Sequence, residues 1–200
     1  MARWEPNAPE RLVAAALGLF EERGYEATTV IEIAERAGLT KSTFFRYFTD
    51  KREVLFGGET VAGLLAEGIL AAPPEATPLE AVAHALVIVG AQGFRAEYRD
   101  FSSRRRTVIA TNPELLEREA LKGLGLTAAL AGALEERGIP FLISCVAAEL
   151  GALTLKVSYE RWCVDTASID FSDIAIRTLG ELQAAAAYVV ASMVISTGES

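Results

Sequence analysis

The chain has 200 residues, of which 51% are hydrophobic, and it carries a formal net charge of −8. This length and composition allow one ordinary domain or two small ones with an ample core, so a scaffold that depends on disulfides or a structural metal is excluded. The acidic balance excludes binding to nucleic acid over the whole surface, and any such contact must come from a locally basic segment.

The first amphipathic pattern runs from Arg11 to Gly24, where the glycine ends it. Its apolar residues recur at the three- and four-residue spacing of one helix face: Leu12, Val13, Ala16, Leu17, Leu19 and Phe20. The segment before it is polar and contains Arg3 and Glu5. We therefore expect no secretory signal and a cytoplasmic protein.

Two short helices joined by a glycine turn are predicted between residues 28 and 51. Thr29 followed by Glu32 forms a capping box that opens the first helix, and Gly38 ends that helix. Thr40 then caps the second helix. This order of helix, turn and helix is typical of proteins that read DNA, although such corners also occur in helical proteins that do not.

The second of these helices is expected to have one buried and one outward face. Phe44 and Phe48 lie one turn apart and should point inward. The residues left to project outward are Lys41, Ser42, Thr43, Phe45, Arg46 and Tyr47. Together with Lys51 and Arg52 they make this stretch locally positive, as a helix that meets base edges and phosphates requires.

The pattern AxxAGLTKSTFFRYFxxK, close behind a helix that ends in GYEATT, resembles the amino-terminal domain of the TetR family of transcriptional regulators. The resemblance covers residues 10–56, and the remaining three quarters match only in being helical. It implies an all-α fold of about nine helices. Residues 1–56 would form a three-helix helix-turn-helix DNA-binding domain, and residues 57–200 a larger helical domain for ligand binding and dimerisation.

The resemblance also assigns DNA contacts to individual residues. Thr29 and Lys51 would contact phosphates at two helix amino termini, and the recognition surface would consist of Thr40, Lys41, Ser42, Thr43, Phe45, Arg46 and Tyr47. Two positions depart from the commonest family pattern, since Phe45 stands where tyrosine is usual and Tyr47 where histidine is usual. Phe45 lacks a hydroxyl, and it could touch a thymine methyl group or pack on sugar. We therefore expect phosphate anchoring to shift toward Arg46 and Tyr47.

Beyond residue 50 the sequence predicts helices only. A long helix is predicted from Lys51 to Ala71 and ends at a cluster of prolines. This cluster is the weakest point of the connection between the amino-terminal part and the rest of the chain. Further helices are predicted over residues 79–96, 98–110, 113–137, 141–164 and 171–195. The most apolar run, residues 184–195, is too short to span a bilayer, so no membrane partner is expected.

The last two predicted helices are rich in small residues. Gly151 and Gly180 stand in these helices together with many alanines, and small residues permit a close approach of neighbouring helices. The resemblance implies that both helices pair with their copies in a second chain. The sequence therefore predicts a homodimer with a four-helix interface.

Glycines in two other stretches, residues 89–94 and 122–126, suggest helices bent around a cavity. The resemblance implies that such a cavity binds an apolar small-molecule effector. Candidate lining residues are Phe94, Tyr98, Phe101, Phe141, Cys145, Tyr159 and Trp162. Each of them could equally be an ordinary core residue.

The predicted function is sequence-specific regulation of transcription. A homodimer would place its two amino-terminal domains, called heads below, on a near-palindromic operator in double-stranded DNA. A small-molecule effector would release the dimer from the operator, so the protein would act as a repressor. Two alternatives stay open: a helical protein that sequesters an effector without binding DNA, and an uncharacterised enzyme. The sequence names neither the operator nor the effector, and it does not separate a repressor from an activator.

An enzyme is the less favoured alternative. The chain has a single histidine, no phosphate-cradling GxxxxGK loop and no nucleophile elbow. Its two cysteines, Cys145 and Cys163, lack metal-ligand spacing and are expected to be small buried residues. We therefore expect no catalytic residues, no metal and no cofactor.

Overall fold

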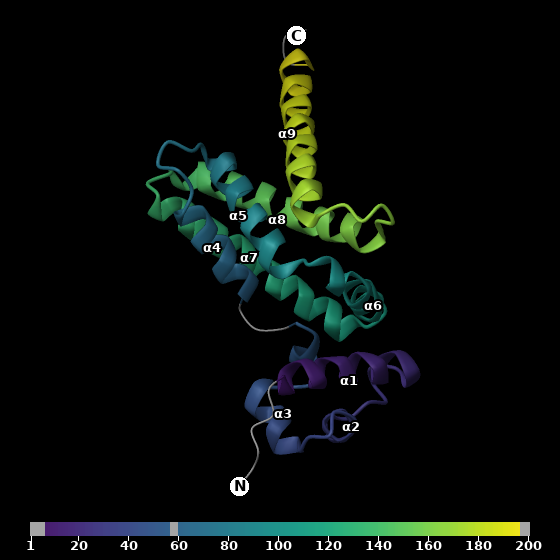
Figure 1. The fold of residues 1–200 in the computed structure, drawn as a ribbon. Helices are drawn as coiled ribbons and strands as arrows, with labels where there is room; N and C mark the ends of the chain where they lie inside the picture. The colour runs from purple at the N-terminus through teal and green to yellow at the C-terminus, as the bar shows by residue number, and fades with distance from the viewer. Residues whose placement is uncertain (1–6, 57–59, 197–200) are drawn as a thin grey trace. The chain divides into compact units, whose positions relative to one another are not determined.

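The structure is a computed structural model that describes residues 7–56 and 60–196 (Figure 1). Over these residues the chain forms nine α-helices and two short 3-10 helices and contains no strand, which confirms the all-α prediction. The elements are α1 (Ala8–Arg23), α2 (Val30–Arg36), α3 (Lys41–Tyr47), η1 (Arg52–Leu55), α4 (Thr60–Leu70), α5 (Pro78–Gly93), η2 (Ala96–Tyr98), α6 (Arg99–Ala110), α7 (Pro113–Glu136), α8 (Phe141–Val164) and α9 (Phe171–Ser196).

The chain divides into two compact units. The first comprises residues 1–58 together with 101–121, and the second comprises residues 59–100 together with 122–200. The predicted division at residue 56 assigned residues 101–121 to the second domain, and that boundary stays a prediction. Val108, Ile109 and Leu115, which lie in this stretch, are buried in one hydrophobic cluster with residues of α1 to α3, which explains why the structure groups them with the first unit.

The first unit contains the predicted helix-turn-helix. The capping box is present, because the Thr29 hydroxyl accepts the Glu32 N–H at 3.3 Å and the Glu32 carboxylate accepts the Thr29 N–H at 2.8 Å. Gly38 follows α2 with φ +66°, a left-handed conformation that favours glycine. Thr40 caps α3 by accepting the Thr43 N–H at 3.1 Å.

The predicted inward face of α3 is confirmed. Phe44 is fully buried and Phe48 is 8% exposed, and both belong to the hydrophobic cluster of the first unit. The Phe44 and Phe48 rings lie 5.4 Å apart, and Leu12 and Ile33 from the two preceding helices are fully buried in the same cluster. This packing fixes α3 so that Lys41, Ser42, Phe45 and Arg46 are exposed, whereas Thr43 and Tyr47 are half-buried.

The prediction of one long helix from Lys51 to Ala71 is wrong at its amino end. Residues 52–55 form the 3-10 helix η1 instead, and α4 begins at Thr60. The Asp50 carboxylate accepts the N–H groups of Arg52 at 2.8 Å and Glu53 at 3.1 Å and thereby starts the 3-10 turn.

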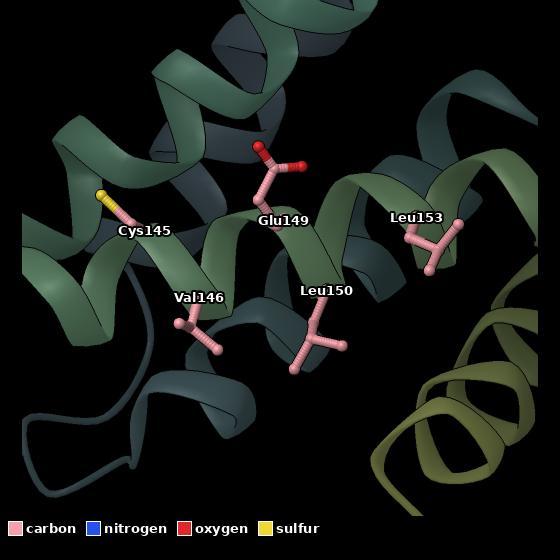
Figure 2. A pocket seen from close by; sticks show the side chains of 5 residues that line it. All are labelled: Cys145, Val146, Glu149, Leu150 and Leu153. Carbon is pink, nitrogen blue, oxygen red and sulfur yellow. The ribbon is translucent and has the colours of Figure 1, made fainter. Parts of the chain in front are cut away.

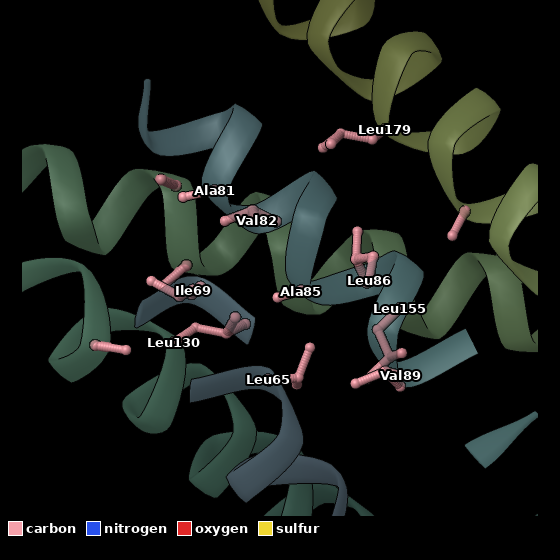
Figure 3. Packing of buried hydrophobic residues seen from close by; sticks show 14 of the residues in the cluster. Leu65, Ile69, Ala81, Val82, Ala85, Leu86, Val89, Leu130, Leu155 and Leu179 are labelled. Carbon is pink, nitrogen blue, oxygen red and sulfur yellow. The ribbon is translucent and has the colours of Figure 1, made fainter. Parts of the chain in front are cut away.

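In the second unit α5 packs against α4, α8 and α9 (Figures 1 and 3). Its residues Val82, Ala85 and Leu86 are fully buried in the core. Figure 3 shows them among side chains from four other helices, namely Leu65, Ile69, Leu130, Leu155 and Leu179. The helix bounds predicted from Pro78 onward differ from the observed ones by a few residues at most.

Gly151 lies at a close approach of neighbouring helices, as predicted, but these helices belong to its own unit. It is buried, and a Cβ atom added there would come within 2.9 Å of Val82 Cγ1 on α5 and 3.3 Å of Leu130 Cδ1 on α7. Its small size therefore serves helix packing inside the unit. Gly180, in contrast, is exposed and has no heavy atom within 4 Å of such a Cβ atom, outside its own helix and chain neighbours.

Two helices, α8 and residues 171–192 of α9, are long and apolar enough to cross a membrane by length and composition alone. The core helix of a soluble protein passes the same test. Ala148, Thr154 and Trp162 on α8 are buried inside the unit. The expectation that the protein has no membrane partner stays a prediction.

Candidate nucleic-acid interface

The predicted recognition residues gather on the outward side of α3. Thr40, Lys41, Ser42, Phe45 and Arg46 are exposed, whereas Thr43 and Tyr47 are half-buried. The hydroxyl groups of Thr40 and Thr43 lie 3.0 Å apart, because both take part in capping the helix. The geometry therefore presents a small surface with two cations, several hydroxyl groups and one exposed aromatic ring.

Phe45 is the most prominent apolar side chain of this surface. It is 48% exposed, and its ring meets the buried Phe44 ring edge-on, with centroids 5.5 Å apart and an interplanar angle of 80°. Lys41, one turn earlier, holds its ammonium nitrogen 5.9 Å from the Phe45 centroid. Aromatic and cation–π contacts of this kind favour one orientation of the ring.

Arg46 and Tyr47 form a second pair of a cation and an aromatic ring. Arg46 Nη2 donates a hydrogen bond of 3.1 Å to the Tyr47 hydroxyl, and the guanidinium carbon lies 4.9 Å from the Tyr47 centroid. The Tyr47 ring packs against the hydrophobic cluster, whereas Arg46 is exposed. Tyr47 therefore connects the guanidinium of Arg46 to the body of the first unit.

Several other charged side chains of the first unit form ion pairs. Arg52 contacts Asp50 at 2.9 Å, and two further arginine–carboxylate pairs join Arg36 to Glu22 and Arg104 to Glu21. Over the described residues, Lys41 and Arg46 have no carboxylate within 4.0 Å. The two cations of α3 thus remain available to an anionic partner, although the chain as a whole is acidic.

Thr29 and Lys51, the predicted phosphate contacts outside α3, are both occupied within the protein. The Thr29 hydroxyl donates to Glu32 at 2.7 Å, and this bond together with the Thr29 N–H lowers the pKa of the Glu32 carboxyl. Lys51 Nζ donates to the Tyr25 carbonyl at 2.8 Å and lies 3.9 Å from the Tyr25 centroid.

Tyr25 was not singled out in the sequence analysis, yet it links three segments of the first unit. Its hydroxyl donates to the Glu114 carboxylate at 3.2 Å, and burial together with this hydrogen bond raises the pKa of the phenol. Glu114 is 89 residues away along the chain. No local pattern could have indicated this contact, because it depends on how the start of α7 packs within the first unit.

The seven candidate effector-binding residues do not line one cavity. Phe94, Tyr159 and Trp162 meet in an aromatic cluster that also contains Phe171, with Phe94 and Phe171 stacked at 4.0 Å. The other candidates lie elsewhere: Tyr98 and Phe141 are 45% and 64% exposed, Cys145 is half-buried on α8, and Phe101 packs against the cluster of the first unit.

Two open hollows lie on the exposed side of α8. Figure 2 shows the first, of about 460 Å³, which is lined only by α8 residues: Cys145, Val146, Glu149, Leu150 and Leu153. The second, of about 590 Å³, also involves the start of α5 and Gln183 on α9. Exposed apolar side chains surround them, including Leu142 at 73% and Val146 at 61% exposure.

Comparison with known proteins identifies the amino-terminal segment. The family pattern described as "Bacterial regulatory proteins, tetR family" matches residues 12–56. The chain is 40% identical over 80 residues to the transcriptional regulator TcmR of Streptomyces glaucescens, which covers 38% of this chain and 34% of that protein. It is also 39% identical to the regulator HbdR of Aromatoleum over 46 residues, a match that covers 23% of this chain and 20% of that protein. The chain therefore matches about a third or less of the length of these relatives.

Solved structures extend the similarity to nearly the whole chain. FadR of Thermus thermophilus, a TetR-family repressor solved in complex with lauroyl-CoA, is 26% identical with a TM-score of 0.51 over 88% of this chain and 93% of that one. SmeT, a repressor of a Stenotrophomonas maltophilia efflux pump, shares the fold at 19% identity and a TM-score of 0.54, over 88% and 89% of the two chains. Residues 12–56 therefore match the amino-terminal domain of the TetR family, and the chain as a whole shares the fold of FadR, a TetR-family repressor.

Proposed function

We propose that the protein is a sequence-specific DNA-binding regulator that inserts α3 into the major groove. The observation that supports this most directly is the outward face of α3, where Lys41 and Arg46 are exposed and free of carboxylates on a helix fixed by Phe44 and Phe48. Arg46 and the Tyr47 hydroxyl supply phosphate or guanine contacts, and Ser42 and Thr43 add polar groups. Thr40 contributes at the edge of the surface.

The proposed active form is a homodimer. Large apolar side chains are exposed along α8 and α9, among them Phe141, Leu142, Ile143, Val146, Leu153, Ile176, Tyr188, Val189 and Val190. Residues 183–192 of α9 are exposed all round, and Figure 1 shows this end of α9, in yellow, running beyond the other helices of its unit. A helix that is apolar on all sides is normally buried, and a second copy would cover it.

Dimerisation gives the DNA-binding surface its second half. Two heads related by a twofold axis fit two half-sites about 34–36 Å apart on a near-palindromic operator. Sedimentation at micromolar concentration should therefore show a dimer of the 21.4 kDa chain. A single species of monomer mass would contradict the proposal.

We also propose that a small apolar effector releases the protein from DNA, so that it acts as a repressor in the cytoplasm. The ligand-bound state of Thermus thermophilus FadR supports an effector in this fold. The aromatic cluster of Phe94, Tyr159 and Trp162 is the best candidate for its binding region. Members of this family are regulators, and we propose no enzymatic activity.

The decisive experiment is a selection of DNA sequences from a random pool with the purified protein, followed by gel shift on the selected site. The expected result is one near-palindromic sequence, bound with an affinity that falls steeply with salt. No sequence-specific shift at low salt would contradict the proposal. Effector binding without DNA binding would instead favour a sequestering protein, and turnover of a small molecule would favour an enzyme.

A further inference from the structure

Phe45 carries an apolar ring in the middle of a polar surface. It is 48% exposed, whereas the buried Phe44 next to it is fully covered. Its neighbours on the outward side of α3, Ser42 and Arg46, are polar or charged. When α3 enters a groove, water leaves this ring, and the ring gains most if it meets an apolar group on the DNA.

The orientation of the Phe45 ring is set before any DNA binds. The edge-on contact with Phe44 at 5.5 Å supports it from the core side, and the Lys41 ammonium lies 5.9 Å from its centroid. Phe44 is itself immobilised in the hydrophobic cluster. A side chain held in place in this way loses little conformational entropy when it makes a contact.

The floor of the major groove offers few apolar groups. Guanine, cytosine and adenine present hydrogen-bond donors and acceptors there, whereas thymine adds its C5-methyl group. A tyrosine at this position could reach a phosphate oxygen through its hydroxyl, but phenylalanine has no such atom. The ring of Phe45 is therefore suited to a thymine methyl group and unsuited to phosphate.

We propose that Phe45 recognises the C5-methyl group of one thymine in each half-site and so selects a T·A pair at that position. This inference rests on the proposed DNA-binding function. Burial of one methyl group predicts that its loss weakens binding about fourfold in each half-site. For a dimer on two symmetric half-sites the combined effect is about 16-fold.

The test replaces each thymine of the selected operator, in symmetric pairs, with deoxyuridine, which removes the methyl group alone. We expect one pair of replacements to weaken binding of the wild-type protein by about 16-fold and the others to change it less than about twofold. Phe45→Ala should bind the thymine operator more weakly than the wild type does. This variant should bind the thymine and the deoxyuridine operators with equal affinity. Phe45→Tyr keeps the ring and should keep the sensitivity to the methyl group.

Ile31→Ala is the matched control, because Ile31 is also 48% exposed but lies on α2. This variant should show the same ratio of thymine to deoxyuridine affinity as the wild type. The inference is overturned if no deoxyuridine replacement weakens binding, if the half-sites contain no thymine, or if Phe45→Ala retains the wild-type ratio. Failure to bind any DNA specifically would overturn the proposed function itself, whereas specific binding without methyl dependence would overturn only this inference.

Discussion

The ammonium group of Lys51 lies 3.9 Å from the centre of the Tyr25 ring and donates a hydrogen bond of 2.8 Å to the Tyr25 carbonyl oxygen. Because Tyr25 in turn donates to Glu114, the three residues connect the start of η1, the turn after α1 and the start of α7. Lys51 is thus positioned to stabilise the head from within.

Replacement of Lys51 with methionine should therefore lower the free energy of unfolding by about 1–2 kcal/mol, because it removes a cation–π contact and a charged hydrogen bond. Urea denaturation measures this change. Lys41→Met is the control, since Lys41 is exposed and should affect stability little. If Lys51→Met left stability unchanged but reduced the salt dependence of DNA binding by about one unit, Lys51 would be a phosphate contact, as its family resemblance implied.

The pair of Arg46 and Tyr47 leads to a prediction about operator affinity. Arg46→Ala should weaken binding about tenfold or more and reduce the slope of log affinity against log salt by about one, because one charged contact is lost. Tyr47→Phe removes only the hydroxyl that accepts the Arg46 hydrogen bond, so it should weaken binding less and preserve most of the slope. Titrations at several salt concentrations provide both quantities. An Arg46→Ala protein with wild-type affinity and slope would show that Arg46 does not touch DNA.

The exposed face of α8 leads to a prediction about assembly. Leu142 is 73% exposed beside the second hollow, and a glutamate there would place a charge in the proposed dimer interface. Leu142→Glu should therefore convert the dimer into a monomer in light scattering, with unchanged helix content. Leu124→Glu is the control, because Leu124 is 68% exposed on α7. A dimer that survives Leu142→Glu would place the interface elsewhere.

An ion pair in the second unit should make its stability depend on pH. Arg99 Nη1 contacts the Asp165 carboxylate at 2.9 Å, and Arg99 also donates to the carbonyl groups of Asp165 and Ile169. The Ile169 N–H, the Ala167 N–H and Arg99 all lower the pKa of the Asp165 carboxyl in the folded protein. This contribution to stability is present above the unfolded pKa of about 4 and is lost as the pH falls through the lower folded value.

Asp165→Asn should therefore reduce the stability at neutral pH. The stability of the variant should also fall less than that of the wild type as the pH is lowered. Thermal melts between about pH 2 and pH 7 would show the difference as a gap between wild type and variant that narrows with decreasing pH. Asp173→Asn, at an exposed position in the first turn of α9, serves as the control. A difference in melting temperature between wild type and Asp165→Asn that stays constant with pH would contradict the role of this ion pair.

The sequence predicted those features that depend on neighbouring residues. Thr29 with Glu32 gave a capping box that the structure contains, and the apolar spacing of Phe44 and Phe48 gave the correct inward face of α3. These elements were predictable because caps and helix faces are determined within one or two turns of the chain. The same reason explains the accurate bounds of α8.

Features that depend on tertiary contacts were less predictable. Phe101 resembled the other candidate effector residues in sequence, but its neighbours in space belong to the first unit. The sequence predicted Lys51 to be a surface cation, whereas in the structure its ammonium group lies against the Tyr25 ring. Gly151 could not be assigned to an inner or outer face without knowing that Val82 lies opposite. Lys51 and Tyr25 are 26 residues apart along the chain, and Gly151 and Val82 are 69 residues apart (151 − 82).

The inclusion of residues 101–121 in the first unit affects how hybrid regulators should be constructed. Val108, Ile109 and Leu115 complete the same hydrophobic cluster as α1, and Arg104 pairs with Glu21 on that helix. A transplant of residues 1–56 alone onto a related protein would leave its apolar surface facing foreign side chains. An operator specificity that is to be moved between relatives therefore requires both stretches of chain to be exchanged together.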